Sequence, residues 1–271
     1  MKRLGVGLVA YNISRCEIIA LSESIGSFAL SYKVVVDNSP EAKDKDLFEE
    51  LHWIYFHNPN NPGFGSSHNF IYENFGNKAD YHLIVNPDIT FNELILEQLI
   101  CFMDSRPDAG CVMPRVHYPD GRIQRLAKLL PSPLDLLERR LPFRLLTNLK
   151  SFRFELHDAN YESGIFKVPF LSGCFLMFRV ESIRNVGFFD ERFFMYLEDT
   201  DLCRRLWANG SFPYYFGLSS VVHGYARGSS KNVYLFLVHL SSAIKYFYKW
   251  GWFDQGRFEI NLDCLSQFRK A

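Results

Sequence analysis

The sequence predicts an α/β fold with a mainly parallel central sheet flanked by helices. In the first half of the 271-residue chain, short apolar runs alternate with segments of helix-like spacing. Strands buried on both faces of a parallel sheet are continuously apolar, and helices cross over between them. The expected strands are 4–11, 34–37, 51–57 and 81–86, and the expected helices are 16–29, 42–50, 67–75 and 92–103.

Three of these strands end in polar residues that are candidate ligand groups. In open parallel sheets, ligands bind in the crevice outside the carboxyl ends of the strands. We therefore expect these side chains to lie along one edge of the sheet. They are Tyr11 and Asn12, Asp37 and Asn38, and Asn86 and Asp88.

The second half of the chain departs from this regular alternation. Between Arg122 and Arg153 it carries eight basic residues against two acidic ones, with poor periodicity. This composition indicates an irregular or helical insertion that ends near residue 157. The other expected elements are strands at 109–116, 166–178 (broken at 172–174) and 212–218, with helices at 198–210 and 229–250.

Composition and charge exclude several classes of protein. The 30 basic and 30 acidic residues cancel, so no overall field recruits nucleic acid. Six scattered cysteines without a Cys-x-x-Cys pair favour reduced thiols in a cytoplasmic protein. The opening apolar stretch is short and favours a strand over a signal peptide. The apolar stretch 234–247 is too short to span a bilayer.

A loop at 61–69 and an aspartate at position 88 are the first candidates for chemistry. Gly63 and Gly65 let backbone approach a ligand, and the start of the following helix offers unpaired N–H donors. Such glycines also serve ordinary turns, which is the alternative. Asp88 follows a strand and suits a hard cation such as Mg²⁺ or Mn²⁺, unless it caps the next helix.

The second half adds two further candidates. Glu198 and Asp199 stand at the head of an expected helix, where the helix dipole favours ionised carboxylates. An ionised aspartate can act as a general base. The alternative is an ordinary acidic first turn, with Asp201 paired to Arg205. His223 follows a strand and is either a metal ligand or a structural histidine.

Taken together and in order, these motifs resemble glycosyltransferase family 2. The resemblance is greatest to the bacterial rhamnosyltransferase-type enzymes of O-antigen and capsule assembly, and it runs from about residue 4 to about residue 230. The motifs that carry it are Val35–Ser39, Asn61–Asn69, Asn86–Asp88, Ser172–Cys174, Gly187–Glu191, Tyr196–Cys203 and His223.

The resemblance implies a GT-A fold and an inverting hexosyltransferase that depends on Mg²⁺ or Mn²⁺. It divides the chain into a glycosyltransferase domain at 1–228 and a C-terminal helical segment at 229–271. Within the domain, 1–116 is the nucleotide-sugar-binding half, 117–160 the basic insertion, and 161–228 the acceptor and catalytic half.

The resemblance also assigns roles to single residues. Asp199 is the catalytic base, and Asp88 and His223 are the metal ligands. Where the family more often has Asp-x-Asp, this chain has Asn86-Pro87-Asp88, so the donor's phosphates are expected to complete the metal site. The expected donor-binding residues are Tyr11, Asn12, Asp37, Asn38, Gly63, Phe64, Gly65, Asn69 and Asn86. The expected acceptor-binding residues are Ser172, Gly173, Cys174 and Glu198.

The expected partners are a nucleotide-diphosphate sugar and a glycan acceptor linked to a lipid diphosphate, with no nucleic acid. For the donor, dTDP-rhamnose is the first expectation, with UDP- and GDP-sugars open. The basic, apolar segment 134–154 and the aromatic closing helix suggest peripheral contact with the cytoplasmic face of the inner membrane, or else a homodimer contact. The rival functions are a sugar-phosphate nucleotidyltransferase and a catalytically silent nucleotide-sugar or glycan-binding module.

Overall fold

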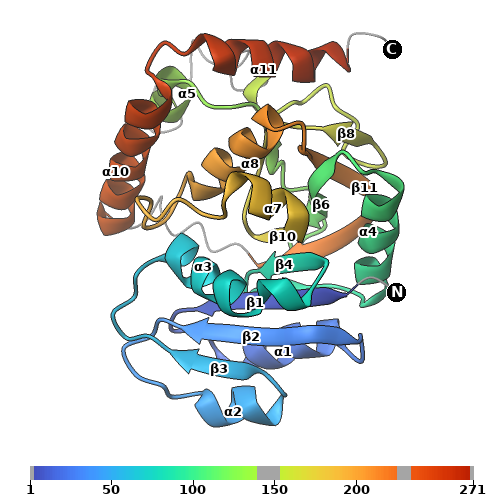
Figure 1. Ribbon diagram of the computed structural model, residues 1–271, viewed down its shortest axis with the longest axis vertical. Helices are drawn as coiled ribbons and strands as arrows, with labels where there is room; N and C mark the ends of the chain where they lie inside the picture. The colour runs from blue at the N-terminus through green and yellow to red at the C-terminus, as the bar shows by residue number, and fades with distance from the viewer. Residues whose placement is uncertain (1–2, 139–152, 225–232, 269–271) are drawn as a thin grey trace.

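The computed structural model describes residues 3–138, 153–224 and 233–268 (Figure 1). It has the predicted α/β character, with a nine-stranded mixed sheet in the described part of the chain. The strands are β1 Leu4–Ala10, β2 Leu30–Asp37, β3 Ile54–His57, β4 Tyr81–Val85, β5 Ile89–Thr90, β6 Ala109–His117, β7 Ala127–Lys128, β8 Ile165–Lys167, β9 Phe170–Leu171, β10 Phe175–Arg179 and β11 Phe212–His223. The helices are α1 Arg15–Ile25, α2 Lys45–Glu50, α3 Phe64–Phe75, the short 3₁₀ helix η1 Gly76–Lys78, α4 Leu94–Ser105, α5 Pro133–Glu138, α7 Val180–Val186, α8 Glu198–Ala208, α10 Val233–Trp250 and α11 Gln255–Ser266.

The first half forms the parallel unit that the sequence predicts. Its strands lie in the order β3-β2-β1-β4, and each neighbouring pair is parallel. In Figure 1, α1 lies behind these strands and α3 lies in front of them. Helix α1 begins with a capping box, in which the Ser14 side chain accepts from the Glu17 N–H and the Glu17 side chain accepts in return. Because β1, β2 and β4 run parallel, their carboxyl ends lie at the same edge of the sheet.

The second half is less parallel than the first. Strand β10 lies antiparallel between β4 and β6, and β11 continues the sheet parallel to β6. Strands β5 and β8 both pair antiparallel with β11. Strand β11 runs to His223, beyond the predicted end near residue 218, so it carries this histidine to the edge beside β5.

Several element boundaries differ from those predicted. Helix α3 begins at Phe64, three residues earlier than expected, so most of the predicted glycine loop is helix. Helix α7 was not predicted, whereas α11 lies within the predicted C-terminal helical segment. The predicted basic insertion contains the short strand β7 and the short helix α5. Residues 139–152 of this insertion and the segment 225–232 lie outside the described residues, and the predicted domain boundaries stay predictions.

Helix α10 packs against α8 and against the segment that precedes it. The Asp201 carboxylate, which is fully buried, accepts hydrogen bonds from Arg205 Nε at 2.8 Å and from Trp250 Nε1 at 2.7 Å. Lys249 Nζ lies 2.7 Å from Asp201 Oδ1 and 2.7 Å from Asp190 Oδ2. The Asp201–Arg205 pairing expected of an ordinary helix is therefore present, and α10 adds two more partners to it. Among the described helices, none combines the length and apolarity needed to cross a bilayer.

Candidate active site

A small cavity lies at the ends of β1 and β2, where the sequence predicts nucleoside binding. Its volume is about 220 Å³. Asp37 is buried there: its Oδ2 accepts from the Tyr55 hydroxyl at 2.7 Å and its Oδ1 from the Ser39 N–H at 2.9 Å. The lining residues are Asn12, Ile13, Asp37, Ser39, Glu41, Lys43, Asp44 and Phe48. The structure thus brings Asn12 and Asp37 into one pocket.

Three residues of this region have surroundings that the sequence did not reveal. The Ser39 hydroxyl accepts from the Asn12 N–H at 2.8 Å and so joins the ends of β1 and β2. Tyr55 was missed because it is one alternating residue in a short strand, and nothing in the sequence pairs it with Asp37. Tyr11 is half exposed next to the pocket.

Two predicted donor-binding amides are committed to contacts within the protein. The buried Asn38 side chain exchanges hydrogen bonds with Ser67 at 2.8 and 3.1 Å. Asn69 Nδ2 donates to the Phe189 carbonyl at 2.8 Å, and the Phe189 N–H donates back to Asn69 Oδ1 at 2.9 Å. The Asn69 amide therefore fastens α3 to the segment 187–194, and its role in donor binding stays a prediction.

The glycines of the 61–69 motif are explained by the same packing. Gly63 has φ 103°, and a Cβ there would lie 2.2 Å from the Phe194 carbonyl oxygen. A Cβ on Gly65 would lie 2.9 Å from that of Phe189. The Phe64 N–H donates to the Phe194 carbonyl at 3.0 Å. These contacts explain why glycine is needed at both positions, and the close approach of their backbone to a donor stays a prediction.

A second pair of predicted site residues, Asp88 and His223, lies where β5 pairs with the end of β11. Asp88 Oδ1 lies 3.4 Å from His223 Nε2. The Nδ1–H of His223 donates to Gln124 Oε1 at 3.0 Å, and Gln124 Nε2 donates to the His223 carbonyl at 2.9 Å. Gln124 therefore fixes the imidazole with Nε2 towards Asp88. No local pattern points to Gln124, which follows a turn in a polar stretch.

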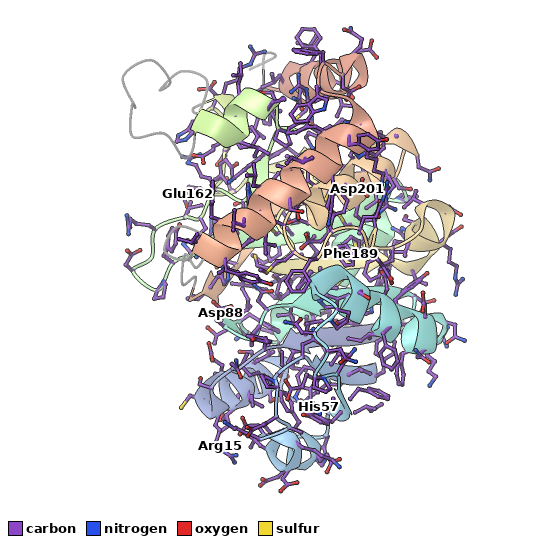
Figure 2. The ribbon with its side chains drawn as sticks, turned by 90° about the vertical axis from the view of Figure 1, so that its left-hand side faces the viewer. Arg15, His57, Asp88, Glu162, Phe189 and Asp201 are labelled. Carbon is purple, nitrogen blue, oxygen red and sulfur yellow. The ribbon has the colours of Figure 1, made fainter. Side chains whose placement is uncertain are left out.

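The charges at this pair favour a proton or a cation between them. Burial by itself lowers the pKa of His223, but hydrogen bonds with Asp88 and Cys174 outweigh it and raise the pKa to about 10. Gly224 leaves room beside the pair, since a Cβ there would approach the Asp88 Cβ at 3.4 Å. Figure 2 shows Asp88 between the strands of the first half, which carry His57, and the part of the second half that carries Asp201.

The segment Ser172–Cys174 connects Asp199, the predicted base, with the predicted metal ligands Asp88 and His223. The Gly173 N–H donates to Asp199 Oδ2 at 2.9 Å, and the next side chain, that of Cys174, contacts His223. The Cys174 carbonyl accepts from the Asn86 N–H at 2.8 Å, so β4 is tied to the same link. The Ser172 N–H donates to the Leu126 carbonyl at 3.2 Å. Asp88, Asp199 and His223 are thus joined through two consecutive residues.

Glu198 and Asp199 are adjacent carboxyls in different surroundings. Burial and then the Asp199 charge raise the pKa of Glu198 well above its ordinary value. Burial also raises the pKa of Asp199, but hydrogen bonds from the Gly173 N–H, the Thr200 N–H and the Thr200 hydroxyl oppose it. Glu198 Oε2 has no hydrogen-bond partner, whereas the Asp199 carboxylate accepts from three donors. These donors stabilise the ionised form of Asp199, so Asp199 is the better candidate of the two for a proton acceptor.

The side chains at this site could supply only some of the ligands that a divalent cation needs. In the described part of the chain there is no group of three or more His, Cys, Asp or Glu side chains able to hold a metal. The Asp88 oxygen and the His223 nitrogen are two suitable ligands that face each other. Oxygen-rich ions such as Mg²⁺ and Mn²⁺ are commonly bound by one or two carboxylates together with substrate phosphates. These two residues therefore fit a cation that a diphosphate completes.

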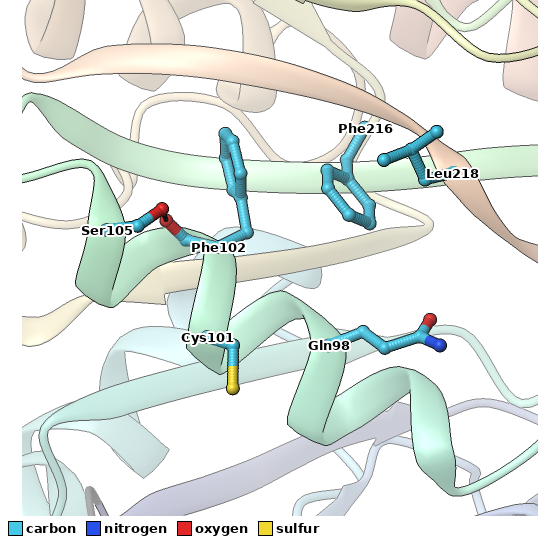
Figure 3. Close-up of a pocket in the computed structure, with 6 residues that line it drawn as sticks. All are labelled: Gln98, Cys101, Phe102, Ser105, Phe216 and Leu218. Carbon is cyan, nitrogen blue, oxygen red and sulfur yellow. Dashed lines mark hydrogen bonds between the residues drawn. The ribbon is translucent and has the colours of Figure 1, made fainter.

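A larger depression lies apart from these groups, between α4 and β11 (Figure 3). Its volume is about 450 Å³, and its lining contains one thiol and no carboxylate or imidazole. The lining residues are Gln98, Cys101, Phe102, Ser105, Phe216 and Leu218. Size alone does not make it the active site, because its lining has no carboxylate or imidazole to act as a base or to bind a hard cation.

Comparison with known proteins finds that the chain is similar to glycosyltransferases. No family model matches it. It is 29% identical over 161 residues to the N-acetylglucosaminyl-diphospho-decaprenol L-rhamnosyltransferase of Mycobacterium tuberculosis. The aligned region covers 56% of this chain and 50% of that protein. The chain thus spans about half the length of the mycobacterial relative. It is 25% identical over 238 residues to rhamnosyltransferase WbbL of Escherichia coli K12, covering 83% of this chain and 86% of that one.

Solved structures show the same fold at low sequence identity. The structure of GalNAc-T7 with UDP, GalNAc and Mn²⁺ matches with a TM-score of 0.63 at 13% identity, over 82% of this chain and 43% of that one. The mannosyltransferase PcManGT from Pyrobaculum calidifontis, with GDP-Man and Mn²⁺, matches with a TM-score of 0.58 at 14% identity, over 100% of this chain and 70% of that one. The predicted GT-A fold is therefore confirmed. By fold the chain is a GT-A protein, and in sequence it is similar to rhamnosyltransferases.

Proposed function

We propose that this chain is an inverting glycosyltransferase of bacterial surface polysaccharide biosynthesis, which transfers rhamnose from dTDP-rhamnose to a glycan acceptor. The observation that carries the proposal is the link from Asp199 through Gly173 and Cys174 to the Asp88–His223 pair. It puts a proton acceptor and a potential cation site at the same edge of the sheet. The similarity to rhamnosyltransferases supports the choice of sugar.

In the proposed reaction, an acceptor hydroxyl attacks the anomeric carbon on the face opposite the leaving nucleoside diphosphate. The new glycosidic bond forms as the bond to the diphosphate oxygen breaks, which inverts the configuration. Asp199 takes the hydroxyl proton, and this role fits a carboxylate whose oxygens accept hydrogen bonds that favour its ionised form. Burial raises the pKa of the adjacent Glu198 well above its ordinary value, so this side chain is suited to hold a proton beside Asp199.

Asp88 and His223 would hold Mg²⁺ or Mn²⁺, which when bound neutralises charge that develops on the leaving diphosphate. Both solved relatives named above contain Mn²⁺ together with a nucleotide or nucleotide sugar. On the donor side, the Asp37 carboxylate is positioned by Tyr55 and Ser39 to accept hydrogen bonds from the nucleoside. Tyr11 is suited to stack beside it. The acceptor proposed is a glycan linked to a lipid diphosphate, as in the name of the mycobacterial relative.

The proposal is tested by incubating the chain with a panel of dTDP-, UDP- and GDP-sugars, Mn²⁺ and a water-soluble glycan acceptor. Release of nucleoside diphosphate together with a glycosylated product is expected with dTDP-rhamnose. A nucleotidyltransferase would instead release pyrophosphate from a nucleoside triphosphate and a sugar phosphate. A binding module would bind the donor and leave it intact with every acceptor.

A further inference from the structure

The backbone just before the candidate base has an unusual conformation. Tyr196 and Leu197 have φ values of 72° and 67°, which lie in the left-handed region. Bulky residues rarely adopt this region because their Cβ then crowds the backbone, and they remain there only where surrounding contacts hold them. Leu197 is the N-cap of α8, and Glu198 and Asp199 follow it directly. The direction in which the two carboxyls leave the backbone therefore depends on this left-handed pair.

Helix α10 contacts the chain immediately before the left-handed pair. The buried Ser242 hydroxyl donates to the Met195 carbonyl at 2.8 Å. Three residues further along α10, Lys245 Nζ donates to the Arg192 carbonyl at 2.7 Å. Leu197 itself packs in a buried cluster to which α10 contributes three side chains. They are Ala243, Tyr246 and Phe247.

The same helix also holds the chain just after the candidate base. Asp201, in the first turn of α8, is fully buried and its Oδ1 accepts from Trp250 Nε1 at 2.7 Å. Helix α10 therefore fixes the chain on both sides of Glu198 and Asp199. Figure 1 shows this helix along the outside of the molecule, away from the sheet, and its buried cluster is distinct from the main hydrophobic core.

On the opposite side, the position of Asp199 is marked by one backbone hydrogen bond. Asp199 Oδ2 accepts from the Gly173 N–H at 2.9 Å. A displacement of the carboxylate by about 1 Å breaks a hydrogen bond of this length. The state of the Gly173 amide therefore reports whether the carboxylate is in place.

We propose that Ser242 is a positioning residue for Asp199. Its hydrogen bond to the Met195 carbonyl holds the left-handed pair, and the pair directs the Asp199 carboxylate at the Gly173 N–H. Ser242 does not act on the reacting atoms itself. The role of Asp199 as a base rests on the proposed function, whereas the positioning of its carboxylate rests on these contacts alone.

The experiment compares Ser242→Ala with a matched control, Ser22→Ala, at a temperature where both variants are folded. Ser22 of α1 is also buried, and its hydroxyl donates to the Ile18 carbonyl at 2.8 Å, so the control loses a bond of the same kind. Steady-state kinetics with dTDP-rhamnose, Mn²⁺ and a water-soluble acceptor give kcat and KM. Amide hydrogen exchange at Gly173 reports the position of the Asp199 carboxylate independently of any reaction.

In Ser242→Ala we expect kcat to fall by at least about tenfold while KM for the donor stays unchanged, because a misplaced proton acceptor weakens the transition state and not donor binding. The Gly173 amide should exchange at least about threefold faster than in the wild type. Ser22→Ala should keep the wild-type kcat and the wild-type exchange at Gly173.

A second comparison tests the left-handed pair itself. Tyr196→Gly removes a side chain that disfavours positive φ, so the backbone needs less support there. In this background, the added Ser242→Ala change should lower kcat by less than about threefold. An equal loss in both backgrounds would overturn the proposal, because Ser242 would then act by another route.

Unchanged kcat together with unchanged exchange at Gly173 in Ser242→Ala would also overturn it. So would a fall in kcat without faster exchange at Gly173, because the Asp199 carboxylate would still be in place. Faster exchange with an unchanged kcat would leave the positioning intact and refute Asp199 as the base. A wild-type chain that transfers no sugar refutes the proposed function, and the exchange at Gly173 then decides the positioning by itself.

Discussion

The Gly173 N–H donates a hydrogen bond to Asp199 Oδ2 at 2.9 Å, and this bond fixes the carboxylate to the residue that precedes Cys174, which contacts His223. A Cβ on Gly173 would lie 3.6 Å from that of Asp199, so the backbone passes close to the acid. The bond also lowers the pKa of Asp199 against the effect of its burial. A backbone donor does this without adding a charge, which leaves the carboxylate basic enough to accept a proton.

The first prediction concerns Asp199. Asp199→Asn keeps an oxygen that can accept from Gly173 but removes the basic group. We expect turnover to fall by about 10²–10⁴ while donor affinity stays unchanged. Single-turnover kinetics and donor titration measure the two separately. Asp263→Asn, at an exposed aspartate of α11, is the control and should match the wild type. Undiminished turnover in Asp199→Asn would remove this residue from the role of base.

The second prediction concerns the proposed cation site. Asp88→Ala removes the one carboxylate that faces His223 Nε2. The gain in donor affinity that Mn²⁺ provides is expected to fall by at least about tenfold, because a charged contact is lost. Calorimetry of dTDP binding with Mn²⁺ and with a chelator measures that gain. Asp158→Ala, at an exposed position, should keep it. Identical wild-type affinity with and without Mn²⁺ would contradict a metal site here.

The third prediction concerns the pH dependence of stability at Glu198. The folded-state pKa of Glu198 is raised above its ordinary value of 4.5 by burial and by Asp199. Its contribution to stability is therefore complete below the unfolded pKa and is lost as the pH rises through the folded pKa. Glu198→Gln is neutral at every pH and lacks this loss. Thermal unfolding should show the variant gaining on the wild type as the pH rises from 5 to about 8. Parallel stability profiles would show that Glu198 is not held protonated.

The fourth prediction separates packing from binding at Asn69. Asn69→Ala leaves the Phe189 N–H and carbonyl without their amide partners at a buried position. We expect the free energy of unfolding to fall by about 1–3 kcal/mol in urea titration. Donor affinity, measured at a temperature where the variant is folded, should remain that of the wild type. Asn74→Ala, on the exposed side of α3, is the matched control and should change stability little. A loss of donor affinity without a loss of stability would instead bear out the role of Asn69 in donor binding.

Much of the first half followed from local sequence pattern. Apolar runs with polar ends predicted β1 and β4 closely and the second half of β2, because burial of a parallel strand dictates the character of each of its residues. The same pattern placed Asn12, Asp37 and Asp88 at strand ends. The start of α3 was missed, since Gly63 and Gly65 look like loop residues until Phe189 and Phe194 occupy the space beside them.

The sequence by itself determined the α/β class, the strand-end residues and the acidic head of α8, because each depends on neighbours a few positions away. The tertiary structure alone decided that β10 runs antiparallel between β4 and β6. It also decided that Gln124 orients His223 towards Asp88, and that Gly173 holds Asp199. These contacts join distant parts of the chain, and their geometry is set by how the sheet closes over its core rather than by any local pattern.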